Sequence, residues 1–170
     1  MSDLESSTSS NPDPYAGLAY DHIAIVTHDY ERLIAWYEEI LDFQVSEEWT
    51  APQVVPGSRL AYLVHGSGVR LEIVSSPSVE ARVTKSNSIV DDFQSAGMRH
   101  VCFYVDSVDA SFKEAVSRGA GVLAPPFDFA PLQRRLALIQ DPDGNTIEFV
   151  QRMPRLENAQ SAANAVMDED

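Results

Sequence analysis

Cysteine, basic residues and long apolar segments are all scarce in this chain, and each shortage argues against a class of protein. Cys102 is the only cysteine among 170 residues, which excludes an intrachain disulfide and a cluster of thiolate metal ligands. No apolar run approaches the roughly 20 residues needed to span a bilayer. Only 12 lysines and arginines stand against 26 aspartates and glutamates, so we expect no binding to nucleic acid or to a membrane. These shortages are typical of a cytoplasmic protein.

The two ends of the chain differ in composition from its body. Residues 1–17 are rich in Ser, Pro and Asp and lack the basic and apolar regions of a secretory signal, so we expect a disordered leader. Residues 153–170 are expected to form an acidic tail. The body, residues 18–152, is long enough for a single domain, and a hydrophobic content of 44% is sufficient for a buried core.

The body of the chain repeats itself. Residues 59–74 align without a gap onto residues 135–150, with identical residues at six positions. A second pair of similar segments lies upstream, at residues 21–26 and 99–105. A repeat of this length indicates two copies of one structural unit.

Each copy of the repeat has one histidine early and one glutamate late. The repeat places His22 opposite His100 and Glu72 opposite Glu148. Two such units bring four potential metal ligands to related positions, which is stronger support for a metal site than any single motif in the chain.

The same order of elements is expected in both halves, namely a strand, a helix and three strands. In the first module, residues 18–76, the strands are expected at 20–26, 43–49, 59–65 and 69–75, with the helix after Asp29. In the second module, residues 98–152, the strands are expected at 99–105, 121–127, 134–140 and 145–151, with a helix at 107–118. Residues 77–97 read as a linker with a short helix.

Strand alternation places the four candidate ligands on the faces opposite the apolar ones. Residues two apart share a face of a strand. His22 therefore lies on the face opposite that of Ile23 and Ile25, and Glu72 lies on the face opposite that of Leu71 and Ile73. The apolar faces should pack on the helices and the ligand faces should line a cavity. A carboxylate in such a place is costly unless it has a partner, and a metal ion would be one. Cys102, on the face of His100, is expected to be a small buried residue.

Residues 20–152 resemble the vicinal oxygen chelate superfamily, which includes glyoxalase I, methylmalonyl-CoA epimerase, extradiol dioxygenases and bleomycin resistance proteins. The resemblance is carried by DHIAIV, AWYEEILDF, LEIV, RHVCFYV and above all DPDGNTIEFV. It implies an α+β fold of two tandem βαβββ modules that form an incompletely closed eight-stranded barrel-like sheet with the helices outside. It also implies one divalent metal ion, Zn, Co, Ni, Mn or Fe, with the ligands His22, Glu72, His100 and Glu148.

The resemblance is closest to the epimerase and glyoxalase I branches, and it implies a metal-dependent epimerase or isomerase. The enzyme would move a proton on a carbon next to a chelated carbonyl of a small hydroxy-ketone, sugar-like ketone or acyl substrate. Glu148 is the first choice for the catalytic base and Glu72 the second. Epimerases of methylmalonyl-CoA usually have Gln where Glu72 stands, which argues against that substrate.

Three alternatives stay open. A glyoxalase I type lyase shares all four ligand types, whereas an extradiol dioxygenase would use two His and one Glu around Fe(II) and leave Glu72 without a role. A non-catalytic small-molecule binding or resistance protein of the same fold would lack the metal.

The resemblance also implies partners for the site. Small members of the superfamily are commonly homodimers, in some of which the site is shared between subunits. Candidate contacts to a small-molecule substrate are Arg59 and Arg135, which the repeat pairs, together with Tyr104 and Phe127.

Overall fold

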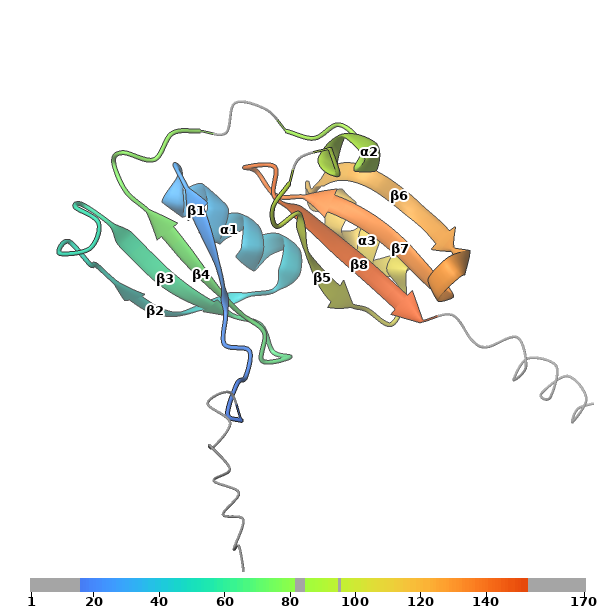
Figure 1. Cartoon of the computed structure of the whole chain (residues 1–170), viewed down its shortest axis with the longest axis horizontal. Helices are drawn as coiled ribbons and strands as arrows, with labels where there is room; N and C mark the ends of the chain where they lie inside the picture. The colour runs from blue at the N-terminus through green and yellow to red at the C-terminus, as the bar shows by residue number, and fades with distance from the viewer. Residues whose placement is uncertain (1–15, 82–84, 95, 153–170) are drawn as a thin grey trace, which may run out of the picture.

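Two βαβββ modules lie side by side in the computed structural model, which describes residues 16–81, 85–94 and 96–152 (Figure 1). The expected acidic tail and nearly all of the expected leader lie outside these residues. Within the described residues, no helix is long and apolar enough to cross a membrane.

The first module forms a four-stranded sheet covered by one helix. Its strand order is β1-β4-β3-β2, with β1 parallel to β4 and the other pairs antiparallel. The elements are β1 (Ile23–Thr27), α1 (Tyr30–Leu41), β2 (Gln44–Trp49), β3 (Arg59–Val64) and β4 (Arg70–Ser75).

The second module repeats this topology. Its sheet has the order β5-β8-β7-β6, with β5 parallel to β8. The elements are β5 (His100–Tyr104), α3 (Val108–Ser117), β6 (Gly121–Phe129), the 3₁₀ turn η1 (Ala130–Leu132), β7 (Arg134–Gln140) and β8 (Thr146–Arg152). The linker contains the expected short helix, α2 (Ile89–Asp92).

The expected fold class, two tandem βαβββ modules, is confirmed. The eight strands are divided into two four-stranded sheets that are not closed on each other. The largest difference from the expected strand limits is at β1, which was expected from residue 20 and begins at Ile23. Strand β6 continues two residues beyond its expected end, to Phe129, because it stays paired with β7 as far as Arg134.

Helix limits follow from capping residues. The Asp29 carboxylate accepts a hydrogen bond from the backbone N–H of Arg32 and so caps the start of α1. Asp42 ends α1 in the left-handed conformation, with φ of 54°. In the second module Ser107 caps α3 by accepting from the N–H of Ala110.

Each sheet buries its apolar face against its helix, as the alternation of residues predicts. Leu71 and Ile73 of β4 are fully buried, as are Ile139 and Ile147 in the second module. The two cores also touch, because Trp36, Leu41 and Phe103 each pack against both of them. Helices α1 and α3 contact each other at this junction.

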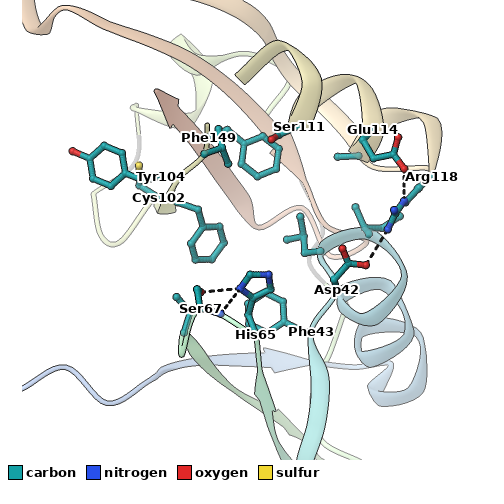
Figure 2. Close-up of a pocket in the computed structure, with 16 residues that line it drawn as sticks. Asp42, Phe43, His65, Ser67, Cys102, Tyr104, Ser111, Glu114, Arg118 and Phe149 are labelled. Carbon is teal, nitrogen blue, oxygen red and sulfur yellow. Dashed lines mark hydrogen bonds and ion pairs between the residues drawn. The ribbon is translucent and has the colours of Figure 1, made fainter. Parts of the chain in front are cut away.

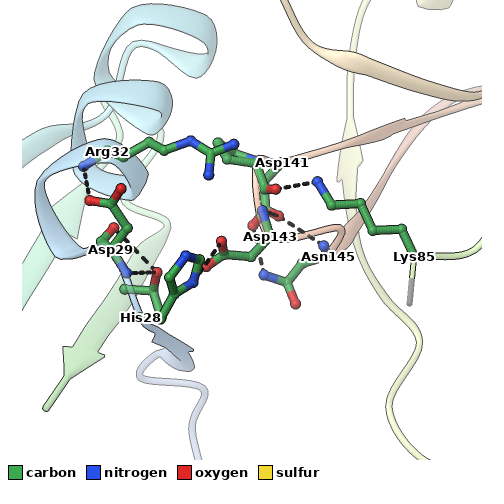
Figure 3. A network of polar contacts seen from close by, with 9 residues as sticks. His28, Asp29, Arg32, Lys85, Asp141, Asp143 and Asn145 are labelled. Atoms are coloured by element: carbon green, nitrogen blue, oxygen red, sulfur yellow. Dashed lines mark hydrogen bonds and ion pairs between the residues drawn. The ribbon is translucent and has the colours of Figure 1, made fainter. Parts of the chain in front are cut away.

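A polar network joins the modules where the β7–β8 turn meets α1 (Figure 3). The buried Asp141 carboxylate accepts hydrogen bonds from the backbone N–H groups of Asp143, at 3.0 Å, and Asn145, at 2.8 Å. It also accepts from the hydroxyl of the buried Tyr37, at 3.3 Å. Burial raises the pKa of Asp141 above its usual value. The Asp-Pro-Asp-Gly turn therefore organises its own backbone and also contacts the first module through Tyr37.

Candidate metal centre

The first pair of candidate ligands lies just before β1 and in the middle of β4. His22 Nε2 is 3.4 Å from a carboxylate oxygen of Glu72, and the side chains are 29% and 18% exposed. The parallel pairing of β1 with β4 sets Ala24 beside Glu72, which brings the neighbouring His22 within reach. The other ring nitrogen, Nδ1, lies 2.9 Å from Asp21 Oδ1. A carboxylate that accepts a hydrogen bond from Nδ1 fixes the orientation of the histidine ring and leaves Nε2 able to bind a metal ion.

The second pair occupies the equivalent place in the other module. His100 Nε2 is 2.9 Å from a carboxylate oxygen of Glu148, and the side chains are 27% and 15% exposed. Here β5 is parallel to β8 and Cys102 stands beside Glu148. His100 Nδ1 is buried and has no hydrogen-bond partner among the described residues. The two pairs therefore share their placement on the backbone and differ in whether the histidine Nδ1 has a hydrogen-bond partner.

The two pairs do not meet within one chain. Among residues 16–81, 85–94 and 96–152, no three His, Cys, Asp or Glu side chains are close enough together to hold a metal ion. Each pair supplies one imidazole nitrogen and one carboxylate oxygen, a donor set suited to Zn or Fe(II), but metal centres commonly take at least three protein ligands. Each module thus presents one His–Glu pair, which we call a half-site, and the residues fit a divalent ion only when the two pairs are combined.

An aromatic wall borders the first half-site. The Tyr62 ring centroid is 5.3 Å from that of His22, and Trp49 lies 4.6 Å beyond Tyr62. The antiparallel pairing of β3 with β4 sets Tyr62 directly opposite Glu72. Neither aromatic residue was predicted from the sequence to lie at the site. The expected β3–β4 hairpin could have indicated Tyr62, because it pairs Tyr62 with Glu72.

Cys102 corrects one sequence expectation, because it is exposed and not a small buried residue. It lies on the ligand face of β5, beside Glu148 of β8. Desolvation of the thiol, and after it the neighbouring Glu148 carboxylate, raise the pKa of Cys102 to about 12. The side chain is therefore a neutral thiol near pH 7.

The four expected substrate contacts fall in different places. Arg59 pairs with Glu31 of α1 at 2.6 Å, and Arg135 pairs with Asp109 of α3 at 2.6 Å. Both arginines thus lie on the helix side of their sheets, away from the His–Glu faces. The other two expected contacts are Tyr104, which is 64% exposed on the ligand face, and Phe127, which packs beside the buried Leu123, Ala124 and Leu138.

A cavity of about 560 Å³ lies between the modules (Figure 2). Its apolar wall includes Phe43 and Phe103, and its polar lining includes Arg118, which pairs with Asp42 and Glu114. His65 also lines it, and its Nδ1 lies 2.8 Å from Ser67 Oγ. None of the four candidate metal ligands lines this cavity, so it is separate from the half-sites.

The chain is similar to known proteins over its whole body. Residues 19–149 match the family model of the Glyoxalase/Bleomycin resistance protein/Dioxygenase superfamily. An uncharacterized protein of Bacillus subtilis strain 168, YwkD, is 32% identical over 132 residues, which are 77% of this chain and 94% of YwkD.

Solved structures share the fold. A glyoxalase family protein from Enterococcus faecalis is 24% identical with a TM-score of 0.62, over 78% of this chain and 96% of that one. The trypanothione-dependent glyoxalase I of Leishmania major is 22% identical with a TM-score of 0.58, over 87% and 94%. Members of this superfamily typically bind a divalent metal ion. By its sequence match and its two βαβββ modules, the chain belongs to the Glyoxalase/Bleomycin resistance protein/Dioxygenase superfamily.

Proposed function

We propose that this protein is a divalent-metal-dependent epimerase or isomerase whose active site is shared between two copies of the chain. The observation that carries the proposal is the pair of matched half-sites, His22 with Glu72 and His100 with Glu148, each with a histidine Nε2 beside a glutamate carboxylate. Either half alone offers two ligands, whereas both together offer four.

A homodimer combines the halves without moving the modules of one chain apart. A twofold axis that brings the first half-site of one copy onto the second half-site of its partner creates two identical four-ligand sites. The exposed positions on both ligand faces support this assembly, because Val26 and Cys102 are uncovered in the single chain and would become buried.

Zn, Co, Ni, Mn or Fe(II) fits a set of two imidazoles and two carboxylates, with further positions open for substrate oxygens. A cation bound there supplies Lewis acidity to a substrate carbonyl. Glu148 takes the proton from the neighbouring carbon and Glu72, from the partner copy, returns one to the opposite face. Asp21 holds the His22 ring through Nδ1, and Tyr62 with Trp49 limits the access of water from the β2–β3 side.

The second candidate is a glyoxalase I type lyase, which the same four ligand types support. The two reactions differ in where the proton returns, to the same carbon in an epimerase and to the neighbouring carbon in the lyase. Turnover of a glutathione hemithioacetal by the metal-loaded protein, without racemisation of hydroxy-ketones, would select the lyase.

Solvent exchange at carbon tests the proton transfer. The metal-loaded dimer is incubated in D₂O with hydroxy-ketones, ketoses and short acyl thioesters, and deuterium incorporation is followed by NMR. Glu148→Gln keeps an oxygen ligand but removes the base, so metal content should persist while exchange falls about 10²-fold or more. Glu38→Gln, an exposed glutamate of α1, is the matched control and should exchange at the wild-type rate. Exchange that is unchanged in Glu148→Gln would contradict its role as the base.

A further inference from the structure

Two arginines that oppose each other at one end of the second sheet are not used by the proposed chemistry. Arg134 begins β7 and Arg152 ends β8, and the antiparallel pairing of these strands places the two directly opposite each other. Tyr104, at the end of β5, lies beside them on the same sheet, opposite Val150.

All three side chains share the face of the second half-site. Arg152 is four residues from Glu148 along β8, and Tyr104 is four residues from His100 along β5, so strand alternation keeps them on one face. At about 3.3 Å per residue, four residues separate the basic end from the candidate metal ligands by about 13 Å.

The two guanidinium groups have no carboxylate partner among the described residues, although the chain has more than twice as many acidic as basic residues. Four other arginines, Arg59, Arg70, Arg118 and Arg135, each hold an aspartate or glutamate. Like charges directly opposite each other on a sheet lower the stability of the fold. A facing pair of arginines without a counter-charge is therefore not explained by a role in stability.

The basic end is held in place. Arg134 donates hydrogen bonds from Nη1 to the backbone carbonyls of Leu132 and Gln133, both at 3.1 Å, which leaves its other N–H groups available. The Arg152 guanidinium carbon lies 5.2 Å from the centroid of the Tyr104 ring. Hydrogen bonding to Arg152, supported by Arg134, lowers the pKa of the Tyr104 hydroxyl.

We propose that Arg134, Arg152 and Tyr104 form an anion subsite that binds a phosphoryl group of the substrate, an assignment that rests on the proposed active site and names its substrate class. Two guanidinium groups supply two positive charges and planar N–H pairs that match phosphate oxygens, and the phenol adds one donor. A single carboxylate would engage only one such fork. The substrate is therefore a phosphorylated ketone or acyl compound whose phosphoryl group lies about 13 Å from the chelated oxygens along the strand direction.

Binding of inorganic phosphate to the full-length protein, measured by calorimetry in a phosphate-free buffer, tests the subsite. Arg134→Gln and Arg152→Gln should each weaken phosphate binding about tenfold or more, the effect of losing a charge-assisted hydrogen bond. Lys113→Gln, which removes an equal charge from an exposed position on α3, should leave it unchanged. Arg152→Lys, which keeps the charge but not the fork, should retain part of the affinity and guards against loss of folding.

Two results would overturn the assignment. One is phosphate affinity that is equal in wild type and both Gln variants; the other is glutarate binding as tightly as phosphate, which would make this a carboxylate site. The measurement is repeated on protein stripped of metal with a chelator. If the protein binds phosphate but cannot be loaded with metal, the proposed active site is contradicted and the anion subsite stands. If it can be loaded with metal but does not bind phosphate, the anion subsite is contradicted and the proposed active site stands.

Discussion

The two modules have kept the same His–Glu pair and changed what surrounds it. In the first module His22 is held by Asp21 and bordered by an aromatic wall, Tyr62 with Trp49. In the second module His100 has no hydrogen bond at Nδ1 among the described residues, and the end of its sheet is basic. The repeat has thus kept one His–Glu pair in each module, while the contacts around the two histidines have diverged.

If the halves are equivalent as ligand sources, removing either histidine should have the same effect. His22→Ala and His100→Ala are each expected to lower metal affinity at least about 100-fold, since losing a direct ligand costs more than the 10–100-fold typical of losing its hydrogen-bond partner. Metal analysis after equilibration with a metal buffer measures this, with His28→Ala as the control. A large loss for one histidine and none for the other would break the comparison.

The hairpin turns, equivalent in the repeat, should differ strongly in their contribution to stability. Asp141→Ala leaves two backbone N–H groups and the buried Tyr37 hydroxyl without their acceptor, so the free energy of unfolding should fall by about 3 kcal/mol. His65→Ala, at the equivalent position of the first module, should cost only about 1 kcal/mol, because its ring hydrogen-bonds only within its own turn and otherwise contacts the ring of Phe43. Urea unfolding measures both, and equal losses would show that Asp141 does not join the modules.

The support of the two histidines gives a smaller effect. Asp21→Ala should weaken metal binding about tenfold, because the Nδ1 hydrogen bond that orients His22 is lost. Asp106→Ala, an exposed carboxylate in the second module, is the matched control. An unchanged affinity in Asp21→Ala would mean that both histidines are held by packing alone.

The pH dependence of stability gives the smallest effect. Burial raises the folded-state pKa of Asp141 above the usual 3.8, so the folded chain retains this proton more strongly than the unfolded chain. The contribution of Asp141 to stability is therefore greatest in acid and declines as the pH rises above about 4. As the pH rises above about 4, the free energy of unfolding of wild type relative to that of Asp141→Asn should decrease in urea titrations. An increase of this difference with pH would refute a raised pKa for Asp141.

Much of this architecture follows from local pattern. The repeat and the alternation of apolar residues predict the order of elements and the faces that carry His22, Glu72, His100 and Glu148. Such features depend on neighbouring residues, which the sequence displays directly.

Other features depend on contacts between distant segments. At the junction of the modules Trp36, Leu41 and Phe103 pack on both cores, and no local pattern encodes that packing. Likewise, the irregular register between Val45 and Glu47 of β2 precedes the wall residue Trp49, so its place could not be counted from the hairpin. The position of Arg135 on the helix side of its sheet could have been predicted from the sequence, because Arg135 lies two residues from Ala137 and so shares its face.

Mixing two inactive variants tests the shared site most directly. Chains with His22→Ala and chains with His100→Ala are unfolded together, refolded and equilibrated with metal. In mixed dimers one of the two sites combines both intact halves, so a random mixture should regain about one quarter of the wild-type metal content. Each variant alone should bind almost none. A mixture that binds no more metal than its separate components would contradict a site built from two copies of the chain.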